Sequence, residues 1–392
     1  MSYDLKIFTE NIGPNATNQI YTLLSTPPFA DSVVRIMPDV HMGKGCVVGF
    51  TAKLGDKVIP NVIGVDIGCG MLTVCLGKID IDFEALDKFI RKSIPSGSTL
   101  RKEQQKTDTI EKLWCYDELV EIDKLYRALG TLGGGNHFIE VDKDEEGNMY
   151  LVIHTGSRGL GLQVANLYQK KAQEACKHCA DKERREVHDK LVAEGKIEQL
   201  DAELKRVSEK YSARTKVLPE HCYFEGAECE AYLHDMRLCQ KFASESRAKI
   251  AEDIMHFLGV YKAESFETVH NFIDEQNYVR KGAIPAYLGQ RVLIPLNMRD
   301  GCIVAIGKGN PDWNYSAPHG AGRSVSRTMA KELFTEEEYK KAMEGIYTNS
   351  ICRGTLDESP MAYKPADEIL SLVGDTVEIE KVIKPVYNFK HS

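Results

Sequence analysis

Residues 58–76 read VIPNVIGVDIGCGMLTVCL, and this stretch decides the fold. Two apolar runs flank the glycine-rich turn GVDIGCG, which predicts two strands with Asp66 and Cys69 at their junction. Similar runs, VVRIMPDV and CVVGFTAKL, precede it and are separated by glycine and proline turns. Residues 32–79 are therefore predicted to be sheet, with polar motif residues at the strand ends.

The rest of the chain alternates between helical and strand patterns. Residues 83–129 are predicted to be mostly helical, and GTLGGGNHFIEV and MYLVIHTGSRGLG are predicted to form a hairpin across an acidic turn. Residues 163–214 are charged and nearly free of glycine, which predicts a helical insertion with opposite charges at i,i+4 spacing. Further patterns predict a helix over 228–257, strands over 282–306 and a helix over 332–344. The fold expected over residues 1–392 is a single α+β domain, with mixed β-sheets surrounded by helices.

Composition narrows the class of protein. The 392 residues carry 50 Lys and Arg against 58 Asp and Glu, so the net charge of −8 opposes nonspecific coating of nucleic acid but permits a local basic groove. Eleven scattered cysteines argue against a disulfide framework and for a reducing compartment. The sequence has neither a secretory signal pattern nor an apolar run of about 18 residues, so we expect a cytoplasmic protein without membrane association.

Five residues in short motifs are candidate metal ligands. They are Asp66 and Cys69 in the first turn, His137 at the end of a glycine run, His154 at a strand end and His270 in VHNF. Each alone is also compatible with a purely structural role. Histidines on neighbouring strands can nevertheless converge with a thiolate and a carboxylate on one site, and this donor set by itself favours zinc.

His319 belongs to a different kind of motif. PHGAGR places it on a turn of small residues, followed by Arg323 and Arg327 at the expected start of a helix. Such a site suits an anionic phosphate, and a histidine there can act as a nucleophile, although a structural histidine is the simpler interpretation of the motif alone. The CKHC motif at 176–179 suggests zinc, but it has no CxxC counterpart and lies in a charged helical pattern.

Seven blocks, taken in order, resemble the signature motifs of the RtcB family of RNA ligases. They are MPDVHMGKG, VIGVDIGCGM, LGTLGGGNHFIEV, HTGSRGLG, VHNF, HGAGRSVSR and PMAYK. The resemblance spans about residues 36–390 and implies an RtcB-like fold. It also implies GTP-dependent joining of an RNA 2′,3′-cyclic phosphate or 3′-phosphate end to a 5′-hydroxyl end, with two Mn²⁺ ions per chain and a covalent histidine–GMP intermediate.

The resemblance also implies roles for individual residues. Cys69 would bridge the two ions, with Asp66 and His137 completing one site and His154 and His270 the other, and His319 would carry GMP. The implied nucleotide-binding residues are Asn136, Glu140, Asn271, Asn297, Gly320, Ala321, Gly322, Arg323, Tyr363 and Lys390. The implied contacts to RNA or phosphate are His41, Lys44, Arg158 and Arg327.

Two departures from the family pattern concern the nucleotide pocket. The chain has Pro295-Leu296-Asn297-Met298 where many members have Pro-Gly-Ser-Met, and Pro318 precedes His319 where serine is common. Nucleotide preference is therefore less firmly implied than metal binding. A metal-dependent RNA-end phosphoesterase or cyclic-phosphate hydrolase and a noncatalytic RNA-binding scaffold stay open as alternatives. The expected partners are GTP and RNA with broken ends, such as tRNA halves, with room for an archease-type activator, and the expected state is a monomer.

Overall fold

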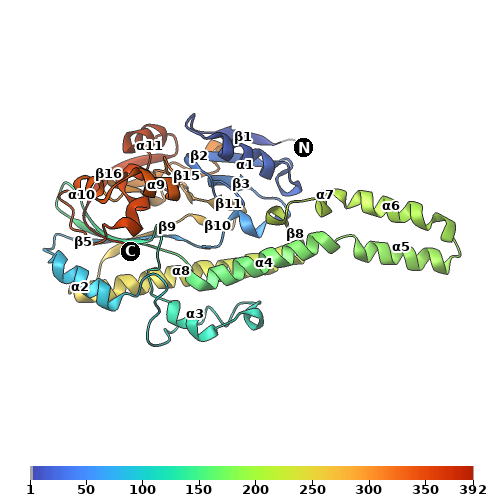
Figure 1. Cartoon of the computed structure of the whole chain (residues 1–392), viewed down its shortest axis with the longest axis horizontal. Helices are drawn as coiled ribbons and strands as arrows, with labels where there is room; N and C mark the ends of the chain where they lie inside the picture. Colours follow the sequence, from blue (N-terminus) through green and yellow to red (C-terminus); the bar gives the residue numbers. More distant parts are fainter. Residues whose placement is uncertain (1–2, 392) are drawn as a thin grey trace.

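The computed structural model describes residues 3–391 and contains two main sheets covered by helices (Figure 1). The larger sheet has seven antiparallel strands in the order β13-β14-β16-β6-β7-β5-β9. Their bounds are Arg291–Asn297, Gly301–Gly307, Val377–Phe389, Phe138–Lys143, Met149–Thr155, Gly70–Gly77 and Glu264–Val269. Edge strands β13 and β9 also approach each other, since the Leu293 N–H donates to Thr268 Oγ1 at 3.0 Å. The sheet is thus strongly curled.

The second sheet has five strands in the order β1-β2-β3-β11-β10, of which only β1 and β2 are parallel. Their bounds are Asp4–Ile7, Val33–His41, Val48–Lys53, Tyr278–Lys281 and Asn271–Ile273. Two small sheets pair β12 with β15 and β4 with β8. Their bounds are Ala283–Pro285, Ser316–Pro318, Lys57–Val58 and Phe224–Glu225. The sheet predicted over 32–79 is confirmed for β2, β3 and β5, which are divided between the two main sheets, and for the two residues of β4. The prediction is wrong for residues 59–69, which form a short 3₁₀ segment and turns.

The junction of the two main sheets positions the glycine-rich turns of the motifs. His270 lies between β9 of the large sheet and β10 of the smaller one, and its N–H donates to the Cys69 carbonyl at 3.0 Å. Gly282, between β11 and β12, donates its N–H to the His270 carbonyl at 2.8 Å. His319 follows β15 directly. Motifs far apart in sequence therefore meet where the two sheets exchange strands.

Helix α8, Ala227–Phe257, is the central helix, and it packs on β5, β7 and α4. Its buried residues recur every three or four positions, as the 3.6-residue period requires of a core-facing stripe. The helix predicted over 228–257 is confirmed, as is the β6–β7 hairpin. The remaining α-helices are α1 (Pro14–Leu24), α2 (Phe83–Ser93), α3 (Ile122–Ala128), α4 (Arg158–His178), α5 (Asp181–Ala193), α6 (Leu200–Lys210), α7 (Ser212–Thr215), α9 (Arg327–Leu333), α10 (Glu336–Ala342) and α11 (Ala366–Leu372).

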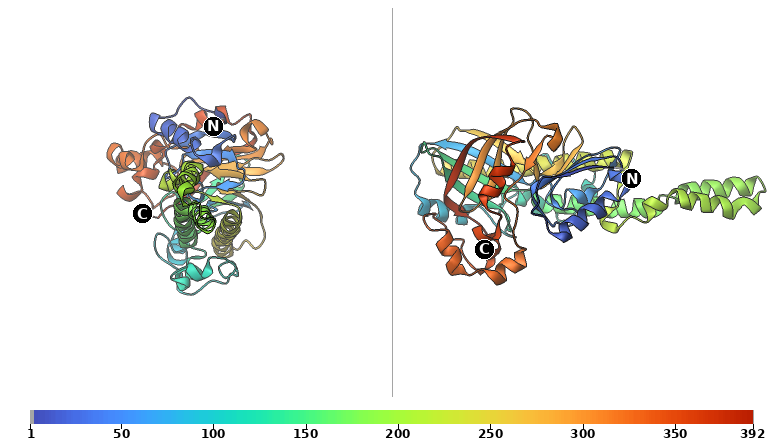
Figure 2. Two further views of the ribbon diagram at one scale, coloured as in Figure 1. Left: turned by 90° about the vertical axis from the view of Figure 1, so that its right-hand side faces the viewer. Right: turned by 90° about the horizontal axis from the view of Figure 1, so that it is seen from above.

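The charged segment 163–214, predicted as a helical insertion, has one part packed on the body of the protein and one part that projects from it. Helix α4 packs its buried side against α8, whereas α5 and α6 form a hairpin that projects from the body of the protein (Figures 1 and 2). The hairpin is held by contacts between its own helices, including the Lys210–Glu183 ion pair at 2.6 Å. Few apolar side chains are buried there, namely Leu191 and Val207.

The prediction that 83–129 is mostly helical is wrong for residues 94–121, which form turns and short 3₁₀ segments between α2 and α3. Carboxylates of α8 take the place of helical hydrogen bonds in this segment. Asp235 accepts from the N–H groups of Trp114 and Cys115 at 2.8 and 3.1 Å, and Glu245 accepts from two threonine hydroxyls. Within residues 3–391, we find no helix that combines the length and the apolar character needed to cross a membrane.

Candidate active site

A cluster of buried donor groups surrounds Cys69. One set consists of Asp66, Cys69 and His137, the other of Cys69, His154 and His270, and the donor atoms within each set lie within 4.8 Å of one another. The Cys69 Sγ atom is 3.5 Å from His137 Nε2 and 3.3 Å from His154 Nε2. The two sets share Cys69, so one thiolate can contact two ions. The structure thus brings together all five predicted ligands.

Backbone carbonyls orient two of these histidines. Leu132 O lies 2.9 Å from His137 Nδ1, and Asn136 O lies 3.2 Å from His154 Nδ1. A carbonyl only accepts, so each ring carries a proton on Nδ1. This directs the Nε2 lone pair of a neutral His154 at the cluster, as in metal-ligating histidines, whereas His137 Nε2 lies 2.9 Å from Asp66 Oδ2. His270 Nδ1 is buried without a hydrogen-bond partner among residues 3–391. These donors suit one or two divalent cations.

The electrostatics of the cluster favour neutral imidazoles at His154 and His270. Burial lowers the pKa of His154 and of His270 well below the ordinary value, and the neighbouring histidines lower it further. Burial opposes ionisation of Asp66, but the hydrogen bond and charge of His137 outweigh it and lower its pKa. Burial and the charge of Asp66 raise the pKa of the Cys69 thiol. Since a bound cation deprotonates a coordinating thiol, metal binding at Cys69 would release a proton.

Close backbone approaches shape the cluster. A side chain at Gly156 would place its Cβ 2.1 Å from Asp66 Oδ1, so only glycine leaves room for the carboxylate. Arg247 of α8 is fully buried and donates from Nη1 to the carbonyls of Gly68 and Thr155, at 2.9 and 2.7 Å. It joins the turn before Cys69 to the end of β7. Sequence reasoning missed Arg247, because nothing near it in the chain marks this long-range role.

His319 lies beside the metal-ligand cluster, with its ring centroid 4.9 Å from that of His270. Its Nδ1 atom is 2.6 Å from Oδ2 of the fully buried Asp39, and its own N–H donates to the same oxygen at 3.2 Å. The carboxylate holds the Nδ1 proton and leaves the Nε2 lone pair available, an arrangement that suits a nucleophile or a base. Asp39 was not among the predicted site residues, although it lies in the MPDVH motif.

The loop after His319 fits tightly against Asp39. Gly322 has φ of 74°, and a Cβ there would lie 2.4 Å from the Asp39 carbonyl oxygen. A side chain would therefore be strained and would also clash with the backbone. Gly322 of the HGAGR motif is thus required for the close approach of this loop to Asp39.

Two hollows meet at His319. A pocket on one side, hereafter the nucleotide pocket, contains most of the predicted nucleotide-binding residues. It is lined by His41, Met71, Asn136, Phe138, Glu140, His154, Pro295, Leu296, Asn297, Met298, His319, Gly320, Ala321, Gly322, Arg323, Arg327, Tyr363, Asn388 and Lys390. The Pro295–Met298 departure from the family pattern lies in this wall.

An open groove on the other side reaches the metal-ligand cluster. The side chains that give it positive charge are Lys44, Lys281, Arg323, Arg327 and Lys364. Asp66, Cys69 and His270 lie at its floor, together with Asn271. Asn271 was predicted as a nucleotide contact, but it lines this groove, where its Nδ2 donates to the Asp66 carbonyl at 3.2 Å. Five residues line both hollows, namely His41, Asn136, His319, Arg323 and Arg327.

One predicted contact residue lies elsewhere. Arg158 is half-buried behind the cluster, where its Nη1 lies 3.3 Å from His137 Nδ1, and it lines neither hollow. Its placement beside a ligand histidine indicates a supporting position.

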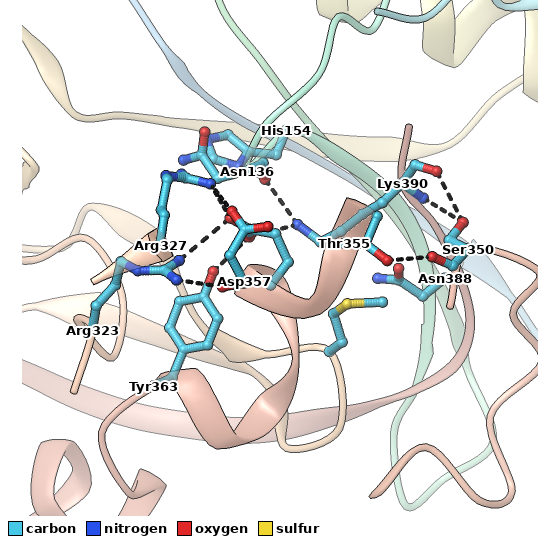
Figure 3. Close-up of polar contacts among 12 residues, drawn as sticks. Asn136, His154, Arg323, Arg327, Ser350, Thr355, Asp357, Tyr363, Asn388 and Lys390 are labelled. Atoms are coloured by element: carbon cyan, nitrogen blue, oxygen red, sulfur yellow. Dashed lines mark hydrogen bonds and ion pairs between the residues drawn. The ribbon is translucent and has the colours of Figure 1, made fainter. Parts of the chain in front are cut away.

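A network of charged side chains joins several residues that line the nucleotide pocket, and Figure 3 shows contacts among them. Glu358 is buried and contacts Lys390 at 3.0 Å, Arg327 at 2.5 Å and the Tyr363 hydroxyl at 2.6 Å. Burial opposes ionisation of Glu358, but Lys390 and Arg327 outweigh it and lower its pKa to about 2. Glu358, also absent from the sequence prediction, therefore fixes three side chains of the pocket.

Known proteins resemble this chain over nearly its whole length. The family described as tRNA-splicing ligase RtcB matches residues 19–122 and 117–391. RNA-splicing ligase RtcB1 of Escherichia coli strain ATCC 25922 is 29% identical over 97% of this chain and 96% of its own, and RNA-splicing ligase RtcB of strain K12 is 28% identical over the same shares. The tRNA-splicing ligase RtcB of Methanococcus maripaludis is 26% identical over 97% of this chain and 92% of its own. With nearly its whole length matched, the chain belongs to the RtcB family and is an enzyme of the RNA-ligase class.

Proposed function

We propose that the protein uses GTP and manganese to join an RNA 2′,3′-cyclic phosphate or 3′-phosphate end to a 5′-hydroxyl end. The observation that carries the proposal is the position of His319. Its ring faces both the nucleotide pocket and the basic groove, next to His270 and hydrogen-bonded to Asp39. A group at this junction can receive a nucleotide from one side and transfer it to an RNA end on the other.

In the first step, His319 Nε2 attacks the α-phosphate of GTP, a P–N bond forms and pyrophosphate leaves. Asp39 stabilises the imidazole as it gains positive charge. Manganese bound by Asp66, Cys69, His137, His154 and His270 would lower charge repulsion at the phosphates. Glu140, at the far wall of the pocket, would accept hydrogen bonds from the guanine edge.

In the later steps, the basic groove would hold the RNA ends. A cyclic phosphate is first opened by water, and the resulting 3′-phosphate attacks the phosphorus of the histidine–GMP and releases His319. The 5′-hydroxyl then attacks the RNA phosphorus of this diphosphate, and GMP leaves. Arg323, Arg327 and Lys44, on the groove wall, would offset the phosphate charge.

Transfer of label from [α-³²P]GTP tests the proposal. We expect one acid-labile GMP adduct per chain with manganese present, which disappears when RNA with a 3′-phosphate is added. A phosphoesterase or cyclic-phosphate hydrolase would process RNA ends without forming the adduct, and an RNA-binding scaffold would do neither. Either result would contradict the proposal.

Removal of the carboxylate partner of His319 is a second test. In Asp39→Asn, we expect adduct formation to slow by on the order of 100-fold, because the ring loses the negative charge that stabilises its positive charge, and an amide NH2 facing Nδ1 would select the wrong tautomer. Rapid-quench measurement of the adduct reports the effect. Asp312→Asn, an exposed carboxylate paired with Lys6, serves as the control. A wild-type rate in Asp39→Asn would remove Asp39 from the mechanism.

The projecting hairpin allows a third test. Replacement of residues 181–210 by a short glycine–serine linker should leave adduct formation unchanged, because α5 and α6 contact mainly each other. RNA affinity should fall by less than about tenfold, since exposed ion contacts contribute about 1 kcal/mol or less each. Filter binding with a 3′-phosphate RNA measures this change. Loss of the GMP adduct would show that the hairpin acts on the site itself.

Three further expectations belong to this proposal. They are a monomer, a cytoplasmic location, which rests on the scattered cysteines and the absence of a signal pattern, and, from the resemblance, a role in tRNA processing or RNA repair that an archease-type activator would accelerate. Multiple-turnover ligation by the purified chain, followed over a range of enzyme concentrations, tests the expected monomer and the expected effect of an activator.

A further inference from the structure

The wall of the nucleotide pocket contains a buried group of acids that the proposed mechanism uses only in part. Glu140 and Asp142 of β6 and Cys302 of β14 have donor atoms within 4.8 Å of one another, and all three are buried. The surroundings are apolar, with Met71, Tyr150 and Ile383 in the same core cluster. Two buried carboxylates this close cannot both be ionised without a large cost.

The hydrogen bonds of the group are unequal. Glu140 accepts from Asn388 Nδ2 at 2.5 Å and from the Cys302 thiol at 3.9 Å. Neither oxygen of Asp142 has a hydrogen-bond donor among residues 3–391, and Asp142 is fully buried. A proton shared by the two acids is therefore favoured on Asp142, which lacks other partners, and the negative charge on Glu140.

We propose that Asp142 is a positioning residue for base recognition: it remains a neutral acid and donates its proton to Glu140, which stays the single anionic acceptor on the pocket wall. This inference rests on the proposed function, in which Glu140 receives the guanine edge. The Oδ1 of Asn388 is buried without a partner in the described chain and lines the same pocket, so it adds a neutral acceptor beside Glu140. Guanine presents N–H donors on its Watson–Crick edge, whereas a protonated Glu140 would itself offer a donor.

The charges around the pair support this assignment. Burial raises the pKa of Asp142 well above its ordinary value, and the charge of Glu140 raises it further. Burial also raises the pKa of Glu140, against hydrogen bonds from Asp142 and Asn388 and the charge of Lys390. Burial and the two acids raise the pKa of Cys302, which therefore remains a thiol. On β7, Tyr150 lies across from Asp142, and its hydroxyl donates to Asp144, which pairs with Lys381 of β16.

The position of the proton can be tested without nucleotide. A folded-state pKa above the unfolded value of about 4 means that folding takes up a proton, so Asp142 costs stability increasingly as pH rises. Asp142→Asn removes this cost and should raise the melting temperature, by more at pH 8 than at pH 5. Asp144→Asn is the matched control on the next turn. Its pKa is lowered despite burial, by Asn148 and Lys381, so this variant should lose stability above pH 4.

The role in base recognition is tested by the pH dependence of nucleotide binding. Asp142→Asn keeps a donor toward Glu140 and should bind GTP within about threefold of the wild-type affinity. Asp142→Ala removes the donor, so Glu140 takes up a proton more readily. We expect about tenfold weaker GTP binding at pH 7, recovery as pH rises, and a smaller preference for GTP over ATP. A purely structural role would give a pH-independent loss that Asn does not rescue.

The outcomes separate this inference from the proposed function. If wild-type protein forms a GMP adduct but Asp142→Ala binds GTP as the wild type does at every pH, the inference is wrong and the function stands. If wild-type protein binds no GTP, the proposed function fails, while the melting experiment still decides where the proton lies. A third manganese or zinc ion, found by elemental analysis in the wild type and lost in Asp142→Asn, would overturn the inference in favour of a metal site.

Discussion

Cys69→Ala should lose RNA ligation by more than about 100-fold while keeping its fold, because removal of even an indirect supporting contact costs a metal site about 10–100-fold. Cys69 is the residue common to both donor sets, so it is the ligand that can contact both ions. The other four ligands each belong to one set only, namely Asp66, His137, His154 and His270. Elemental analysis should show fewer ions per chain. The thermal transition should stay cooperative, since loss of the Cys69 sulfur atom at this turn leaves the surrounding backbone contacts intact.

The matched control for Cys69→Ala is Cys75→Ala. Cys75 lies on β5, the strand that follows the turn holding Cys69, outside both hollows, and packs beside the core cluster that contains Tyr150. It should retain its metal and its activity. Wild-type ligation by the Cys69 variant would contradict the bridging assignment, and equal losses in both variants would indicate a folding defect.

Local patterns predicted the parts of the fold whose stabilising contacts are local. The β6–β7 hairpin and the apolar stripe of α8 follow from periodicity and turn residues. The irregular structure of residues 94–121 could not be predicted in this way, because backbone N–H groups of this segment donate to Asp235, more than one hundred residues away in sequence. The helix-favouring composition of this segment does not reveal that a carboxylate on another helix accepts its hydrogen bonds.

The candidate site shows the same contrast between residues in local motifs and residues that act through long-range contacts. The residues of the glycine-flanked motifs were predicted, and the structure gathers them at one junction. The residues that hold them in place were missed. Asp39 is separated by 280 positions from His319, and Arg247 by 179 from Gly68. Asp142 shows no local sign of its buried environment, because the buried residues of the neighbouring apolar cluster come from six strands. Arg158 illustrates the converse, since its motif suggested a substrate contact while its side chain lies beside His137 and lines neither hollow.

His319→Ala should abolish the GMP adduct, by more than about 1,000-fold, and still bind GTP and metal. The five predicted ligand side chains do not depend on His319 for their hydrogen bonds, since carbonyls of Leu132 and Asn136 orient the rings of the cluster. Gel analysis after incubation with [α-³²P]GTP measures the adduct, and elemental analysis measures the metal. A normal yield of stable adduct in the variant would place the nucleophile elsewhere and leave the HGAGR turn as a phosphate-binding element.

A substrate supplied with its 3′ end already joined to GMP through a diphosphate bypasses the histidine. His319→Ala should seal this RNA at a rate within about tenfold of wild type, because no P–N bond is needed in the last step. His154→Ala and His270→Ala should fail on the same substrate, since each removes a donor of the second set, and charge must still be stabilised as GMP leaves. If His319→Ala were as defective as the ligand variants on the activated RNA, its role could not be that of a covalent carrier alone. The contrast is decisive because His270 and His319 are neighbours, with ring centroids 4.9 Å apart, so a general distortion of the site would affect both alike.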